Sequence, residues 1–173
     1  MNIVLVAVGE VDKKIIEALK HDLNKAFKKQ ITIGKGMPHP NYAFNKKRNQ
    51  YLSTSILKTI VGNKEYATDE KILGIIDYDL YVPKLNFVFG EASRRAAIIS
   101  LTRLRHQFYG LPEDQILFRR RVLTEAVHEL GHTYGLGHCR NSHCVMFFSN
   151  SLIDTDMKGP DFCERCKKNL SVL

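Results

Sequence analysis

The sequence predicts an α/β fold with a mixed β-sheet, and three observations carry this prediction. Residues 2–8 (NIVLVAV) are apolar without alternation, as in a strand that is covered on both faces. A helical pattern, a short strand and a second helical pattern then follow in order. Further strand-like stretches come next, and this order of elements indicates a sheet with mixed strand pairing.

The first half of the chain contains the first two predicted helices. The first helix is indicated by apolar residues at four-residue steps: Ile15, Leu19, Leu23 and Phe27. Residues 31–33 (ITI) then predict a short strand, and residues 34–47 form a loop with Pro, Gly and Asn. Loops of this length are often functional or mobile. The second helix is expected to run through Leu52, Ile56 and Ile60.

The middle of the chain predicts three more strands, at residues 71–77, 87–92 and 95–101. Asp77 and Asp79, in the stretch DYDLY, would share one strand face because side chains alternate along a strand. A pair of carboxylates there is compatible with an ion site. Polar residues at the end of a strand are the simpler interpretation.

A third helix is expected to begin near residues 111–114 (LPED), where a proline and two acids suit a helix start. Its core face is indicated by apolar and aromatic residues at steps of four, three and four: Leu123, Val127, Leu130 and Tyr134. This pattern places His128 and His132 on the helix. Beyond Cys144 the chain is rich in turn formers and is expected to be irregular, with a short helix after Pro160.

Length and charge limit the classes of protein. A chain of 173 residues is expected to form one domain, 1–173, with a core large enough to need no disulfides. Its net charge of +8 comes from scattered lysines and arginines, so a solvated basic surface is a better interpretation than a nucleic-acid site. The apolar start is too short for a membrane span and lacks the basic region of a signal peptide. We therefore expect a cytoplasmic monomer with no membrane contact.

The strongest motif is HELGHTYGLGH, at residues 128–138. His128 and His132 are four residues apart on a helix, so both rings lie on one face and can bind one zinc ion. Gly135 can end the helix in a left-handed conformation and let His138 return as the third ligand. Three histidines leave one position for water, as in a catalytic zinc site. The alternative is a helix with surface histidines and a glycine C-cap.

Glu129 follows the first histidine and is rotated from it by roughly 100° around the helix. It is therefore badly placed as a ligand, but it can reach a water molecule next to the metal. A carboxylate at that place acts as a general base for hydrolysis. His143 lies in a loop, and we expect it to be solvated or to support a ligand.

All four cysteines lie in the last fifth of the chain: Cys139, Cys144, Cys163 and Cys166. Two close cysteines followed by a CxxC are typical of a closed, tetrahedral structural zinc site. A redox CxxC or buried inert thiols are the alternatives. The structural site would hold both flanks of the segment between His138 and Met146, and this adjacency predicts that the two metal sites are coupled.

The motifs together resemble those of the archaemetzincins, a family of metzincin-type zinc metallopeptidases. The resemblance rests on the extended histidine motif, the four cysteines and Met146, which follows Cys144 by two residues. It implies a compact domain with a mixed, twisted sheet and an active-site helix, divided into residues 1–135 and a short zinc-tied subdomain at 136–173. It also implies that Met146 packs beneath the histidines without binding metal; otherwise Met146 is simply a core filler.

The sequence therefore predicts a zinc metallopeptidase that acts on peptides or proteins and holds two zinc ions, one catalytic and one structural. The resemblance further implies that residues 87–92 form an edge strand to which an extended peptide adds, although plain sheet structure is the simpler interpretation. The alternative function is a zinc-stabilised peptide- or protein-binding module with little or no proteolytic activity.

Overall fold

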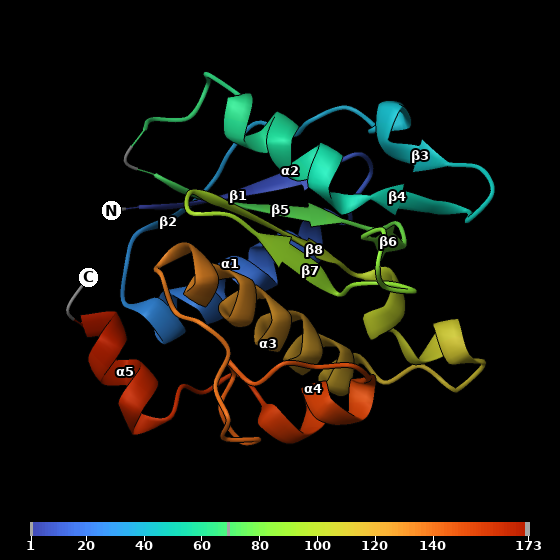
Figure 1. The fold of residues 1–173 in the computed structure, drawn as a ribbon. Helices are drawn as coiled ribbons and strands as arrows, with labels where there is room; N and C mark the ends of the chain where they lie inside the picture. Colours follow the sequence, from blue (N-terminus) through green and yellow to red (C-terminus); the bar gives the residue numbers. More distant parts are fainter. Residues whose placement is uncertain (1, 69, 172–173) are drawn as a thin grey trace.

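The computed structural model describes residues 2–68 and 70–171, and within this part a mixed five-stranded sheet forms the centre of the molecule (Figure 1). Its strands are β1 (Ile3–Val8), β2 (Ile31–Ile33), β5 (Lys71–Ile76), β7 (Gly90–Ala92) and β8 (Ala96–Ser100). The order is β2-β1-β5-β8-β7, parallel except for the antiparallel pair β7 and β8. The predicted α/β fold with mixed pairing is confirmed, and β7 lies at an edge.

Helices cover both faces of this sheet (Figure 1). They are α1 (Lys13–Phe27), α2 (Ser53–Gly62), α3 (Gln115–Thr133), α4 (Leu152–Lys158) and α5 (Glu164–Ser171). Successive side chains of β1 alternate between the faces: Leu5 packs in one core with α1 and α3, and Val6 packs in a second core with α2. No described helix is both long and apolar enough to cross a membrane.

A small second sheet was not foreseen from the sequence. It contains β3 (Phe44–Asn45), β4 (Gln50–Leu52) and β6 (Leu80–Tyr81), in the order β3-β4-β6. The loop predicted at residues 34–47 therefore ends in a hairpin. These strands are too short to show alternation, and they lack the β-branched residues that indicate the equally short strand at 31–33.

Two predicted elements differ from the structure. The strand expected at residues 87–92 begins only at Gly90, because the preceding Val88 instead donates its N–H to the carbonyl of Leu80 at 2.9 Å. The stretch expected to be irregular after Cys144 contains α4. Ser151 and Asp154 form a reciprocal capping box at the start of this helix, and that local signal was overlooked. The expected short helix after Pro160 is α5.

Helix α3 is buried on most of its circumference because the sheet, α1 and the C-terminal segment all pack against it. Asp114 caps its first turn by accepting from the Leu117 N–H at 2.9 Å. Residues after 135 share one core with this helix: Val145, Met146 and Phe162 pack with Leu130. The segment that carries the cysteines is thus held against the helix that carries the histidines.

The glycine in the middle of β5 gives a test of the packing between the sheet and α2. A Cβ on Gly74 would lie 2.6 Å from Ile60 Cδ1, whereas a Cβ on Gly62, at the end of α2, would meet nothing within 4 Å. We expect Gly74→Ala to lower the free energy of unfolding by about 1–3 kcal/mol. Gly62→Ala should leave it unchanged or raise it by about 0.5–1 kcal/mol. Urea denaturation of both variants measures this, and equal effects would contradict the packing account.

Candidate metal centre and active site

The structure brings the three predicted histidines together. His128 and His132 come from adjacent turns of α3, and His138 comes from the loop after it. One ring nitrogen of each lies within 4.8 Å of the other two. His128 is buried, His132 is half-buried and His138 is exposed, so the group is open to solvent on the His138 side.

Two backbone carbonyls determine the tautomers of the helical pair. His128 Nδ1 lies 2.7 Å from the Val145 oxygen, and His132 Nδ1 lies 2.7 Å from the Leu136 oxygen. A carbonyl oxygen only accepts, so each Nδ1 carries a proton and donates it. Each neutral ring then has its lone pair on Nε2, and these two nitrogens are 3.2 Å apart. Two lone pairs at that distance repel unless a cation lies between them, so the donor set fits a metal ion.

The turn after α3 supplies one of these carbonyls. Gly135 has φ +81°, a left-handed conformation that a side chain disfavours, and its N–H donates to the His132 oxygen at 2.9 Å. The Leu136 N–H then reaches the Gly131 oxygen at 3.1 Å. The two bonds close the helix. The turn directs the Leu136 carbonyl back to His132, and Gly135 lies in the left-handed conformation just after the last residue of α3.

The electrostatic environment favours neutral imidazoles, the form that binds metal. Burial is the main cause that lowers the pKa of His128 well below its usual range, and the charge of Lys158 adds to this effect. Burial also lowers the pKa of His132 and of His138. All three rings are therefore ready to act as ligands at neutral pH.

Glu129 is buried beside the histidines, where β7 crosses α3. A Cβ on Gly90 would lie 2.7 Å from Glu129 Oε1, so the strand approaches the carboxyl group more closely than a side chain would allow. Burial raises the pKa of Glu129 well above its usual range, and the nearby Glu125 carboxylate raises it further. Lys158 acts in the opposite direction. A carboxyl group with a raised pKa is a better proton acceptor once it is ionised.

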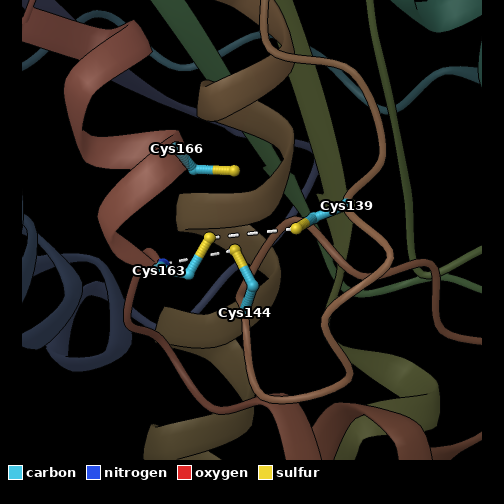
Figure 2. A group of neighbouring side chains, drawn as sticks. All are labelled: Cys139, Cys144, Cys163 and Cys166. Atoms are coloured by element: carbon cyan, nitrogen blue, oxygen red, sulfur yellow. Dashed lines mark hydrogen bonds between the residues drawn. The ribbon is translucent and has the colours of Figure 1, made fainter.

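The four cysteines form a second group, in which one Sγ of each lies within 4.8 Å of the others. Figure 2 shows the sulfurs of Cys139, Cys144 and Cys163 turned toward one another, with Cys166 facing them from α5. All four are free thiols, and Cys139 Sγ and Cys163 Sγ are 3.9 Å apart, too far for a disulfide. Their spacing suits a tetrahedral metal site.

Burial raises the pKa of Cys144 and of Cys166, whereas hydrogen bonds favour the thiolate of Cys163, the form that binds metal. The backbone N–H of Cys166 is the main cause that lowers the pKa of Cys163 to about 7. The Cys163 N–H donates to Cys144 Sγ at 3.4 Å, and Arg165 donates to Cys139 Sγ at 3.3 Å. The donors present therefore fit a thiophilic metal such as zinc.

Residues 139–146 connect the two groups. The Cys139 N–H donates to the Met146 oxygen at 2.8 Å, and the neighbouring Val145 supplies the carbonyl that holds His128. Met146 is fully buried, and its side chain packs against Gly131 of α3, where a Cβ would overlap the sulfur. Met146 therefore packs against α3 at the residue that precedes His132.

A buried ion pair beside this segment was missed by sequence reasoning. Lys158 Nζ lies 3.1 Å from Glu125 Oε1, and both side chains are almost completely buried. The same ammonium group donates to the Phe147 oxygen at 3.3 Å and lies 3.3 Å from His128 Nδ1. Glu125 precedes Glu129 by one helical turn and could have been noticed. Nothing in the sequence around Lys158 indicated its partner.

The surface beside Glu129 is hollowed into a cavity of about 180 Å³. Its walls are formed by the segment 85–90, by residues 148–150 and by Glu125, His128 and Glu129 of α3. Phe148 also packs on His138, with ring centroids 5.0 Å apart. His143, expected to be solvated or to support a ligand, is exposed. The predicted site residues thus meet in two groups that flank one connecting segment.

Comparison with known proteins agrees with this geometry. The model of peptidase family M54 matches residues 7–172. An archaemetzincin from Methanocaldococcus jannaschii is 42% identical and aligns over 98% of this chain and 93% of its own. The crystal structure of an archaemetzincin from Methanopyrus kandleri has a TM-score of 0.85 at 38% identity and covers 99% of this chain and 94% of its own.

A further solved structure, a zinc-dependent peptidase from Methanocorpusculum labreanum, has a TM-score of 0.87 at 28% identity, with 97% of this chain and 99% of that chain covered. The similarity extends over nearly the whole length in each comparison. The chain therefore belongs to peptidase family M54, the archaemetzincins, and is a zinc metallopeptidase.

Proposed function

We propose that His128, His132 and His138 hold the catalytic zinc ion of this metallopeptidase and that Glu129 is its general base. The observation that carries the proposal is the pair of Nε2 lone pairs that face each other at 3.2 Å, beside a buried carboxyl group. A zinc ion held by three neutral imidazoles supplies Lewis-acid chemistry, because it polarises a carbonyl group and lowers the pKa of water.

Glu129 performs the proton transfers. Its carboxylate takes a proton from the water that attacks the carbonyl carbon of the scissile peptide bond. The protonated carboxyl group then gives that proton to the leaving nitrogen as the C–N bond breaks. The wall formed by β7 keeps the carboxyl group in a dry environment, where its raised pKa supports both steps.

The four cysteines hold a second zinc ion in the same proposal, which gives two in total. This ion is structural, since four thiolates leave no position for water. Its role is to fix the segment 139–146, which supplies the Val145 carbonyl to His128 and the Met146 side chain to α3. The substrate is a peptide or protein, and the edge strand β7 beside Glu129 offers it a partner for strand addition.

Replacement of Glu129 by glutamine tests the general base. Glu129→Gln keeps the shape of the side chain but cannot accept the proton, so we expect peptide cleavage to fall by roughly 10²–10⁴-fold while zinc content is unchanged. Digestion of a peptide library, read by mass spectrometry, measures cleavage, and elemental analysis measures zinc. Glu17→Gln, on the exposed face of α1, is the matched control and should have no effect.

Two results would contradict this proposal. Full cleavage by the Glu129→Gln protein would show that another group takes the proton. If instead the unaltered protein binds peptides from the library but cleaves none of them, the chain is a zinc-stabilised binding module.

Replacement of Cys163 by serine tests the link between the two groups. We expect Cys163→Ser to remove one zinc equivalent and to weaken zinc binding by the histidines about tenfold, because the carbonyl that orients His128 loses its support. Titration against a chromophoric chelator measures both affinities. His143→Ala, an exposed residue in the same segment, should change neither. An unchanged affinity of the histidine group in Cys163→Ser would show that the two groups are independent.

A further inference from the structure

One wall of the cavity beside Glu129 is a segment without helix or strand structure along most of its length. It comprises residues 85–90, of which only Gly90 belongs to β7. Irregular segments at an active site are often free to move. Here, however, side chains from distant parts of the chain that do not line the cavity contact this segment and hold it in place.

Two of these side chains come from the hairpin of β3 and β4. Arg48 Nη2 donates to the Leu85 oxygen at 2.8 Å and to the Asn86 oxygen at 3.0 Å. Gln50 Nε2 donates to the Asn86 oxygen at 2.8 Å, and Gln50 Oε1 accepts from Arg48 Nε at 2.9 Å. Gln50 is only 5% exposed, so its bonds to the wall are shielded from water.

Asp79 and Arg103 continue this network. Gln50 Nε2 also donates to Asp79 Oδ2 at 2.9 Å, and Arg103 holds the same carboxylate through bonds of 2.7 and 2.8 Å. The Arg103 guanidinium group lies over the Phe87 ring, 4.2 Å from its centroid. Both carboxylate oxygens of Asp79 are therefore occupied by these donors, which agrees with the simpler interpretation of Asp77 and Asp79 as polar residues at the end of a strand.

The remaining wall residues are held by backbone bonds. The Val88 N–H donates to the Leu80 oxygen at 2.9 Å, and the Phe89 oxygen accepts from the Ser100 N–H at 2.8 Å. Each of residues 85–89 thus contacts a residue that does not line the cavity. A wall held in this way is formed before a ligand binds, so binding does not have to order it.

We propose that Gln50, Asp79, Arg48 and Arg103 are positioning residues that set which substrate side chain the cavity accepts. We call these four residues the bracing network. The cavity is lined by Leu85, Phe87, Val88, Phe89 and Phe148 and by the uncharged polar residues Asn86, Ser149 and Asn150. The side chain it selects is apolar, because most of this lining is apolar and the charge of Glu125 is already paired with Lys158. The inference rests on the proposed function, in that the cavity beside Glu129 receives the substrate.

An isosteric variant tests the network. Gln50→Glu exchanges the amide nitrogen for an oxygen, so the bonds to the Asn86 oxygen and to Asp79 are lost and two carboxylates face each other. Asn49→Asp is the matched control, with the same atomic change and the same change of charge at the next residue. The Asn49 side chain is exposed and its φ is 53°, a conformation that aspartate tolerates.

The first measurement is hydrogen exchange of the wall amides in the zinc-loaded protein. We expect Gln50→Glu to speed exchange at residues 85–88 roughly tenfold, the size expected for one buried acceptor left unpaired. Asn49→Asp should exchange like the unaltered protein. This measurement needs no substrate and does not depend on catalysis.

The second measurement separates the cavity from the metal. Calorimetry compares a succinyl hydroxamate with an isobutyl side chain, which can fill the cavity, with acetohydroxamate, which has no side chain to place there. We expect Gln50→Glu to weaken binding of the first about tenfold and to leave the second unchanged. For a cleaved peptide with an apolar side chain at this place, KM should rise while kcat changes less.

If Gln50→Glu does not fold, Arg48→Ala replaces it in both measurements, because the exposed Arg48 is less important for the core. Lys47→Ala is then the control. The inference is overturned if the wall amides keep their protection, or if they lose it and the isobutyl compound binds as before. Absence of binding by acetohydroxamate to the unaltered protein would instead refute the proposed metal site. If acetohydroxamate does not bind and residues 85–88 of Gln50→Glu still exchange faster, the network holds the wall but has no role in substrate choice. This result also overturns the inference.

Discussion

The hydrogen bonds from two histidines to backbone carbonyls are the constraint on which the rest of the site depends. Because the oxygens of Val145 and Leu136 can only accept, they fix a proton on Nδ1 of His128 and His132 and leave both Nε2 lone pairs facing each other. Neither Leu136 nor Val145 is among the histidines, glycines and cysteines by which the sequence motifs are recognised. The metal-binding geometry is thus built by the backbone on either side of His138, as well as by the side chains.

This constraint explains why the two groups of metal-binding residues adjoin. The carbonyl of Val145 must be held to within a few tenths of an ångström, and it lies in an irregular segment with no helix or strand of its own. The Cys139 N–H, the buried Met146 side chain and the neighbouring Cys144 all restrain it. A closed structural zinc site on that segment would stabilise the position that the histidines require.

The sequence predicted which side chains form the site, but it did not predict most of the tertiary contacts that hold those side chains in place. The spacing of His128 and His132 needs only one regular helix, so local periodicity was enough, and the left-handed Gly135 follows from the steric freedom of glycine. The pair of Glu125 and Lys158 could not be predicted, because 33 positions separate them and the contact depends on how α4 packs on α3. The bracing by Gln50 depends likewise on tertiary packing, in a sheet whose strands are too short to leave a pattern.

Anomalous diffraction at the zinc absorption edge, from crystals of protein purified without chelators, tests the central claim most directly. The account predicts two peaks: one bounded by Nε2 of His128 and of His132 together with a ring nitrogen of His138, and one among the four Sγ atoms. Coordination of His128 or His132 through Nδ1 would contradict it, because the two carbonyls would then have no proton to accept. A single peak would contradict the proposed pair of zinc sites.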